Sequence, residues 1–357
     1  MSRMRVIGFL FCVILTATWM LADGGPDHQA TQPRPIQLGT SGGNVNEASR
    51  AFCCSGTLGA LVTKNTINYI LSNNHVLGRS GAAAVGEDIS QPGLIDNNCR
   101  LPGIVADFSE AAPLGSSNVD AALAQVVDNA VDLTGAILDI GTISGVVAAP
   151  SVGLNVMKSG RTTGQTFGTI GSINTDVNVQ YQKGCNQGKK FVISYINQIV
   201  ISGGGFSAGG DSGSLIVTND ACKQPVGLLF AGSSTSTIAN PAQDVAGALG
   251  VSFVGGSADC SLPPGSTLGG SSGPAQAALD HVRAVKARHS FEVLNTPGIL
   301  GLGVGAADDN PAEAVLVVYV ERGHALPGNI ANSVEGVRIK VVNTDAFVAY
   351  GNEKWGK

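Results

Sequence analysis

A serine enclosed by glycines lies past the middle of the chain, in a setting that suits a nucleophile. The segment reads Gly209-Gly210-Asp211-Ser212-Gly213-Ser214 and leads into the apolar run Leu215-Ile216-Val217. Small neighbours let a substrate carbonyl approach, and the backbone N–H groups around the serine can face a developing oxyanion. Because a serine hydroxyl alone is a weak nucleophile, it needs a base beside it. Acyl transfer therefore requires a histidine and a carboxylate elsewhere in the chain.

The chain supplies both residue types in suitable contexts. His75 follows the apolar stretch Tyr69-Ile70-Leu71, and Asp120 precedes the stretch Ala121-Ala122-Leu123-Ala124. Their order with the serine is His, Asp, Ser, which is one of the three chain orders known for the Ser-His-Asp triad. We therefore predict that His75 takes and returns the proton of Ser212 and that Asp120 orients His75. For Asp120 taken alone, an ordinary turn aspartate is the alternative.

The flanking residues resemble those of trypsin-like serine peptidases of the chymotrypsin fold. The similarity is to the bacterial and plant branch that includes the narrow-leaf regulator of plants, and it covers about residues 50 to 255. The histidine context is Leu71-Ser72-Asn73-Asn74-His75-Val76-Leu77. The later markers of the branch follow in order: Gln91-Pro92-Gly93, Gly160-Arg161-Thr162-Thr163-Gly164, Gly210-Asp211-Ser212-Gly213-Ser214 and Gly227-Leu228-Leu229-Phe230-Ala231-Gly232-Ser233.

This resemblance implies a mainly β protein, a double six-stranded β-barrel, that works as an exported serine endopeptidase on peptide or protein substrates without a cofactor. The N–H groups of Gly210 and Ser212 would hold the oxyanion. Ala231, Gly232 and Ser233 would form the edge along which a substrate backbone pairs by β-augmentation. Phe206, six residues before the serine, would lie at the floor of the primary pocket. A substrate with a hydrophobic or small residue in this pocket is then preferred over one with Lys or Arg there.

Two further residues near the predicted site carry expectations of their own. In animal trypsins a freed N-terminus inserts beside the aspartate that precedes the serine. Asp211 holds that position here, but no cleavage motif and no obvious partner for it are visible, so we predict no activation step of that kind. Arg161 has two readings of equal weight, a support for the active-site loops and a solvated turn arginine.

Composition agrees with a β-rich exported protein. The 357 residues include 49 glycines, and only 13% are charged, as expected for many turns between short strands. The net charge is -5 without a dense basic patch, which argues against nucleic-acid binding. Residues 1–22 read as a signal peptide with a basic start and an apolar run, which predicts a secreted or periplasmic protein without stable membrane insertion. An uncleaved membrane anchor is the alternative.

The cysteines point to disulfides. Six remain after the signal peptide, and an even number in an exported chain favours three bonds, although 15 pairings are possible. We favour a bond between Cys185 and Cys222, with Cys53 and Cys54 bonded to Cys99 and Cys260. A metal site is not favoured, because no Cys-x-x-Cys motif or histidine cluster is present.

The chain divides into segments of different composition. After the signal peptide we predict a linker or arm at 23–50, the peptidase domain at 51–260, a flexible linker at 261–274 and a small α+β domain at 275–357. A rival function follows from this last domain. The chain would then be a peptidase scaffold that acts by binding, or an autoinhibited peptidase whose C-terminal domain mediates interaction or covers the cleft. The oligomeric state has no signal in the sequence.

Overall fold

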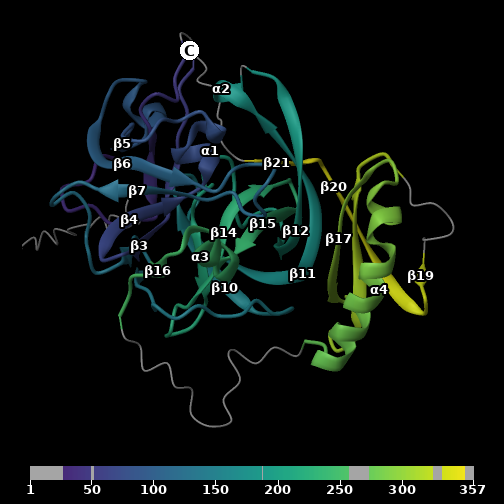
Figure 1. Ribbon diagram of the computed structural model, residues 1–357. Coiled ribbons are helices and arrows are strands. Elements are labelled where there is room, and N and C mark those ends of the chain that lie inside the picture. Colours follow the sequence, from purple (N-terminus) through teal and green to yellow (C-terminus); the bar gives the residue numbers. More distant parts are fainter. Residues whose placement is uncertain (1–26, 50–51, 187, 257–272, 325–331, 350–357) are drawn as a thin grey trace, which may run out of the picture.

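Two curled antiparallel sheets make up most of the molecule, and a smaller layer of strands with one long helix extends the second of them (Figure 1). The computed structural model describes residues 27–49, 52–186, 188–256, 273–324 and 332–349. The signal peptide and the linker predicted at 261–274, apart from residues 273 and 274, lie outside these ranges. Within them, no helix is both long and apolar enough to cross a membrane.

The first barrel is closed by six strands. They are β1 (Thr40–Asn44), β2 (Gly56–Leu58) with its continuation β3 (Ala60–Lys64), β4 (Ile67–Ser72), β5 (Asp88–Gln91), β6 (Gly103–Ala111) and β7 (Ala122–Val126). Gly59 alone separates β2 from β3, so we count the two as one strand. The ring runs from β1 through β2/β3, β4, β7, β6 and β5 back to β1. A short strand, β16 (Ser252–Phe253), adds to β3.

The second barrel is likewise a closed ring of six strands. They are β10 (Asn155–Gly160), β11 (Gly164–Gln182), β12 (Lys190–Ser202), β13 (Leu215–Thr218), β14 (Pro225–Gly232) and β15 (Ser236–Pro241). They pair in the order β10, β13, β14, β15, β12, β11, and β11 pairs again with β10. The predicted double six-stranded β-barrel of chymotrypsin type is therefore confirmed.

Short elements complete the two barrels. They are α1 (Asn74–Leu77), η1 (Arg79–Gly81), η2 (Leu94–Asn97), α2 (Lys183–Asn186), α3 (Ala242–Leu249) and the two-residue strands β8 (Ala136–Ile137) and β9 (Gly141–Thr142). Aliphatic side chains fill each barrel. Leu58, Leu61 and Ile70 are fully buried in the first, and Val156, Ile201 and Leu229 in the second.

The prediction of a linker or arm at residues 23–50 is wrong for its later part. Thr40–Asn44 is strand β1, and all five of its residues are buried. Its sequence, Thr-Ser-Gly-Gly-Asn, carries no apolar signal, because Gly42 faces a large side chain from another strand, Gly43 faces backbone, and polar groups of the strand are hydrogen-bonded inside. Leu58, for example, fills the space beside Gly42, and Asn44 donates to the carbonyl of Leu77 over 2.9 Å.

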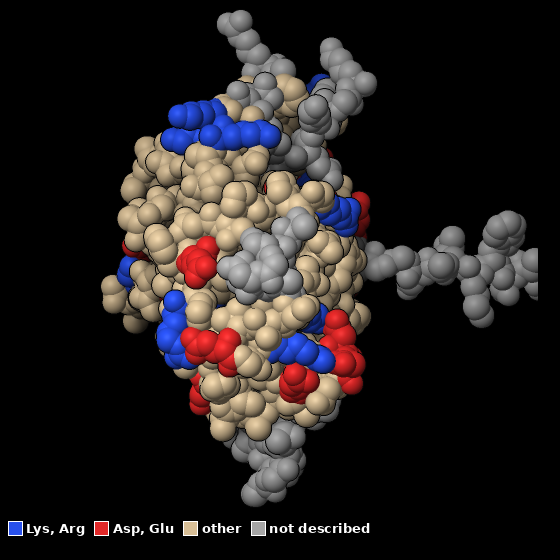
Figure 2. All heavy atoms as spheres, turned by 90° about the vertical axis from the view of Figure 1, so that its right-hand side faces the viewer, with Lys and Arg blue, Asp and Glu red and all other residues tan. Residues whose placement is uncertain are grey.

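The C-terminal layer continues the second barrel. It contains α4 (Gln276–Leu294), β17 (Ile299–Ala306), β18 (Ala314–Glu321), β19 (Ser333–Val334), β20 (Val337–Thr344) and β21 (Phe347–Ala349). Strand β17 pairs antiparallel with β11, so one sheet runs from the barrel into this layer. Helix α4 covers the sheet with Leu279, Val282 and Val285. Figure 2 shows basic and acidic side chains beside one another on this side of the molecule. Arg288 of α4 forms an ion pair with Glu335.

Two disulfides lie within the described residues, and one of them corrects our pairing. Cys53 bonds Cys99, as we favoured for one member of the Cys53-Cys54 pair. Cys185 bonds Cys54 and not Cys222. The reason is the length of the β11–β12 hairpin, whose tip reaches the first barrel, where the Cys185 N–H bonds Glu47 Oε1 over 3.2 Å. Cys222 is itself disulfide-bonded, and Cys260 lies outside the described residues.

Candidate active site

His75 stands at the start of a single helical turn that follows strand β4. The strand ends at Ser72, and α1 begins at Asn74. Two asparagine side chains fix this turn. Asn73 donates to the carbonyl of Asp120 over 2.7 Å, and Asn74 donates to the carbonyl of Ala112 over 2.8 Å. The imidazole is therefore carried on a backbone that is tied to the segment bearing Asp120.

Asp120 is fully buried and lies against His75. Its Oδ2 is 2.5 Å from His75 Nδ1, and its Oδ1 accepts the backbone N–H of His75 over 3.2 Å. The Asn240 side chain accepts the backbone N–H of Asp120 over 2.9 Å. A carboxylate on Nδ1 favours the tautomer that leaves Nε2 free to accept a proton and stabilises the imidazolium that would form. The structure therefore brings together the His and Asp of the predicted triad.

Ser212 lies next to the strand that leads to His75. Its carbonyl accepts the N–H of Thr57 over 2.8 Å, and the hydroxyl of Ser72 donates to the carbonyl of Thr57 over 2.7 Å. Ser212 Oγ and His75 Nε2 are both buried and have no hydrogen-bond partner among the described residues, so the bond between them is not formed in this structure. Nucleophile–base bonds are often long in free enzymes and tighten only with substrate.

The loop before the serine is held by Asp211. Its carboxylate accepts the N–H groups of Thr162 over 2.8 Å and Ala208 over 3.0 Å, and the hydroxyl of Thr163 over 2.7 Å. Lys158 lies 3.4 Å away, and both charged side chains are fully buried. Burial lowers the pKa of Lys158 from its ordinary value, while the charge of Asp211 opposes this shift. Asp211 thus has an internal cation as partner, which we did not expect from the sequence.

Gly210 takes a backbone conformation with φ of +97°, which L-residues rarely adopt. Its carbonyl accepts the hydroxyl of Thr57 over 2.9 Å. Within the described part of the chain, the N–H groups of Gly210 and Ser212 donate no hydrogen bond. These are the two amides that we predicted as oxyanion donors.

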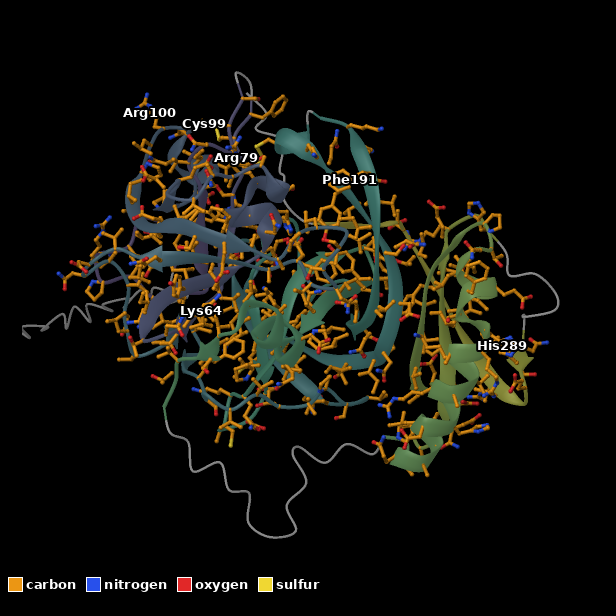
Figure 3. All side chains as sticks on the ribbon, in the orientation of Figure 1. Lys64, Arg79, Cys99, Arg100, Phe191 and His289 are labelled. Atoms are coloured by element: carbon orange, nitrogen blue, oxygen red, sulfur yellow. A yellow bond between two sulfur atoms is a disulfide. The ribbon has the colours of Figure 1, made fainter. Side chains whose placement is uncertain are left out.

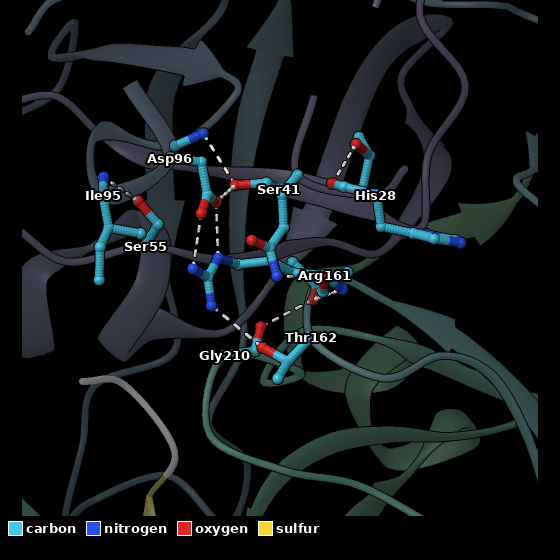
Figure 4. Close-up of polar contacts among 12 residues, drawn as sticks. His28, Ser41, Ser55, Ile95, Asp96, Arg161, Thr162 and Gly210 are labelled. Carbon is cyan, nitrogen blue, oxygen red and sulfur yellow. Dashed lines mark hydrogen bonds and ion pairs between the residues drawn. The ribbon is translucent and has the colours of Figure 1, made fainter. Parts of the chain in front are cut away.

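Arg161 lies between Asp96 and the loop at Gly210 (Figure 4), and its side chain is buried. Its guanidinium is buried and makes a bidentate pair with Asp96, with distances of 2.6 and 2.7 Å. A Cβ atom added at Gly210 would lie 2.5 Å from Arg161 Nη1, so the guanidinium is in direct contact with the loop. Of the two readings of Arg161, the geometry selects the support of the active-site loop.

Tyr181 is a site residue that the sequence did not reveal. Its hydroxyl donates to Asp120 Oδ2 over 2.9 Å, and the hydroxyl of Tyr195 lies 2.7 Å from that of Tyr181. Phe191, labelled in Figure 3, stacks on the Tyr181 ring at 5.5 Å between centroids. Burial raises the pKa of Tyr181 well above its ordinary value, and the charge of Asp120 adds to the shift. Tyr181 is therefore a neutral donor to Asp120.

The residues predicted to bind substrate lie in two places. The Phe206 ring is buried in the core of the second barrel against Gly168 and Ile201, so its role as the pocket floor stays a prediction. Ala231 and Gly232 end strand β14, and Ser233 follows them. The described residues contain no group of three or more His, Cys, Asp or Glu side chains that could hold a metal ion.

The chain is similar to solved serine protease structures. One is described as a glutamic acid-specific serine protease that uses a histidine triad in substrate binding; it is 21% identical, with 61% of this chain and 100% of that chain covered and a TM-score of 0.43. Protease A of Thermobifida fusca is 18% identical, with 62% and 99% covered and a TM-score of 0.42. A Cellulomonas bogoriensis chymotrypsin is 18% identical, with 62% and 99% covered and a TM-score of 0.41. No protein-family model and no curated protein sequence matches the chain.

Proposed function

We propose that this protein is an exported serine endopeptidase with His75, Asp120 and Ser212 as its catalytic triad. The observation that carries the proposal is the buried contact of 2.5 Å between His75 Nδ1 and Asp120 Oδ2, beside the loop that bears Ser212. A buried carboxylate on Nδ1 is the arrangement that makes Nε2 a general base.

The reaction follows from these roles. Ser212 Oγ attacks the scissile carbonyl while its proton moves to His75 Nε2. The N–H groups of Gly210 and Ser212 hold the oxyanion, and one such donor is worth about 2.7–4 kcal/mol in the transition state. The C–N bond then breaks, and the leaving amine takes the proton from His75. Water, deprotonated by His75, hydrolyses the acyl-enzyme ester and restores Ser212. No step needs a cofactor.

The proposal extends to substrate and location. Peptide or protein chains are the substrates, with an apolar or small residue preferred over Lys or Arg because Phe206 brings no acidic group. The predicted signal peptide, together with the disulfides, supports a secreted or periplasmic protein.

Labelling of the purified protein with a fluorophosphonate, read by mass spectrometry, tests the function. We expect one label per chain, on Ser212, and hydrolysis of peptide substrates. Ser212→Ala should abolish both while leaving the circular dichroism spectrum unchanged. Ser214→Ala is the matched control, because the Ser214 hydroxyl donates to the Asp211 carbonyl over 2.7 Å and has no proposed catalytic part. Unchanged hydrolysis by Ser212→Ala would sink the proposal.

A second candidate function is a protein of the same fold that acts by binding. It is favoured by one observation, the pairing of the C-terminal strand β21 with the edge of β14. Absence of label on Ser212 in a folded chain would support this candidate.

A further inference from the structure

The end of strand β14 has an edge that the barrel itself leaves open. Strand β13 pairs with β14 only as far as Leu228, whereas β15 follows the other edge of β14 as far as Gly232. Leu229 is still bonded to Gly213 and Ser214, so the part of this edge that the barrel strands leave without partners lies beyond Leu229. Such an edge binds an extended peptide through main-chain hydrogen bonds.

Strand β21 of the same chain occupies this edge. Val348 lies opposite Gly232 and Ala349 opposite Ala231, in antiparallel register. On its other side β21 pairs in parallel with β11, where Phe347 lies opposite Val179. In Figure 1 the strand lies beside the β11–β12 hairpin. A segment of the C-terminal layer thus fills a groove that is bounded by two strand edges.

Side chains fix the segment in this groove. The Phe347 ring is fully buried and packs edge-to-face on Tyr319, with centroids 5.6 Å apart. The hydroxyl of Thr344 donates to that of Ser233 over 2.5 Å, and Asp345 accepts the hydroxyl of Ser234. The strand pairing suits an extended peptide, and the site of Phe347 suits one buried aromatic side chain. The groove should therefore prefer a peptide with both features.

The segment advances toward Ser212. Its residues 348 and 349 lie opposite 232 and 231, so its direction along β14 is toward Leu229. Leu229 exchanges backbone hydrogen bonds with Gly213 and Ser214, at distances of 2.8 and 3.0 Å. A peptide on this path is delivered to the serine loop.

We propose that residues 344–349 are an intramolecular occupant of the peptide-binding groove and compete there with extended peptides that carry an aromatic side chain at the place of Phe347. That the displaced peptides are substrates rests on the proposed function; the binding itself does not. Because a tethered segment acts at an effective concentration of about millimolar, even weak pairing keeps the groove filled.

Peptide binding to the catalytically silent chain tests this directly. The probe is a fluorescent peptide of residues 343–349, Asn-Thr-Asp-Ala-Phe-Val-Ala, read by anisotropy. The intact chain is full-length Ser212→Ala. The first loosened chain adds Phe347→Ala to it. A second loosened chain adds Val348→Pro instead, which removes a backbone N–H from β21. Loosened chains should bind the probe at least tenfold tighter than the intact chain. Val341→Ala, an exposed change on β20, is the control and should leave binding unchanged.

The same variants with Ser212 restored separate this proposal from the proposed function. Phe347→Ala should raise kcat/KM on a peptide substrate at least tenfold. Tighter probe binding without label on Ser212 in any variant would uphold the groove occupant and refute the peptidase. Label on Ser212 together with equal probe binding to intact and loosened chains, both folded by circular dichroism, would overturn the occupant. A probe with Phe347→Asp should not bind, and its binding would also overturn the preference for an aromatic side chain.

Discussion

The hydroxyl of Tyr181 donates to Oδ2 of Asp120 over 2.9 Å, and the same oxygen faces His75 Nδ1 at 2.5 Å. A phenol has one O–H to donate, and Tyr181 donates it to Asp120. Tyr195 is therefore the donor in the hydrogen bond between the two tyrosines. Burial and neighbouring charge raise the pKa of both phenols above the ordinary value, so both remain neutral donors wherever the peptidase would work. The tyrosines form a relay that ends on the carboxylate of the proposed triad.

Tyr181→Phe should lower kcat about tenfold. A hydrogen bond to a charged group is worth about 1.5–3 kcal/mol, and about 1.4 kcal/mol is a factor of ten in rate. Without this donor, Asp120 Oδ2 loses one of the two groups that fix it and no longer holds the His75 imidazole in one position. The loss should therefore fall on kcat, with KM nearly unchanged. Steady-state kinetics of both proteins measure this.

Tyr195→Phe is the matched control for that variant. It removes a buried hydroxyl from the same relay but leaves the bond from Tyr181 to Asp120 in place, so kcat should change by less than about threefold. If kcat of Tyr181→Phe equals that of the unaltered protein, the positioning role of Tyr181 is refuted and its hydroxyl is structural.

Gly210→Ala should lower kcat strongly and the free energy of unfolding only modestly. The added Cβ would lie 2.4 Å from Thr162 Oγ1 and 2.5 Å from Arg161 Nη1, and φ at 210 is +97°. The loop must shift, which would misplace a proposed oxyanion donor and cost about a hundredfold or more in kcat. The strain itself should lower the free energy of unfolding by only about 1–3 kcal/mol. Gly205→Ala, where an added Cβ meets no atom within 4 Å, should leave both unchanged.

The elements that the sequence predicted well are those with local signals. His75, Asp120 and Ser212 each follow or precede an apolar strand, and their order limits the folds that can unite them. Strand β1 escaped prediction because its buried residues are glycine, serine, threonine and asparagine, whose burial depends on partners in other strands, such as Leu58 for Gly42.

The residues that support the site could not be predicted from the sequence either. Tyr181 lies 61 positions from Asp120, and Lys158 lies 53 positions before Asp211. Neither residue has a motif, since each acts through contacts that form only in the closed barrel. The one available signal for Lys158 was a lysine directly after the apolar pair Val156-Met157 of a strand, because a buried cation requires an anionic partner.

Lys158→Met should destabilise the fold and the serine loop together. It would leave Asp211 buried without its cation, and breaking a buried pair in this way costs about 3–5 kcal/mol. Guanidinium unfolding measures the loss, and the rate of fluorophosphonate labelling reports on the loop. Lys158→Met combined with Asp211→Asn should recover part of the stability, because no charge is then left unpaired. A double variant that is less stable than Lys158→Met alone would contradict this account of the pair.

Removing the Cys54–Cys185 disulfide by changing both cysteines to serine should affect stability and catalysis. The bond closes a loop of 131 residues, against 46 for Cys53–Cys99. In the chain-entropy description these loops correspond to about 5 and about 4 kcal/mol. The Cys54–Cys185 bond also ties the tip of the β11–β12 hairpin to the first barrel, four residues after Tyr181. We therefore expect a lower kcat in this variant and an unchanged kcat when Cys53 and Cys99 are replaced. Equal kcat values in the two variants would show that the hairpin tip does not position Tyr181.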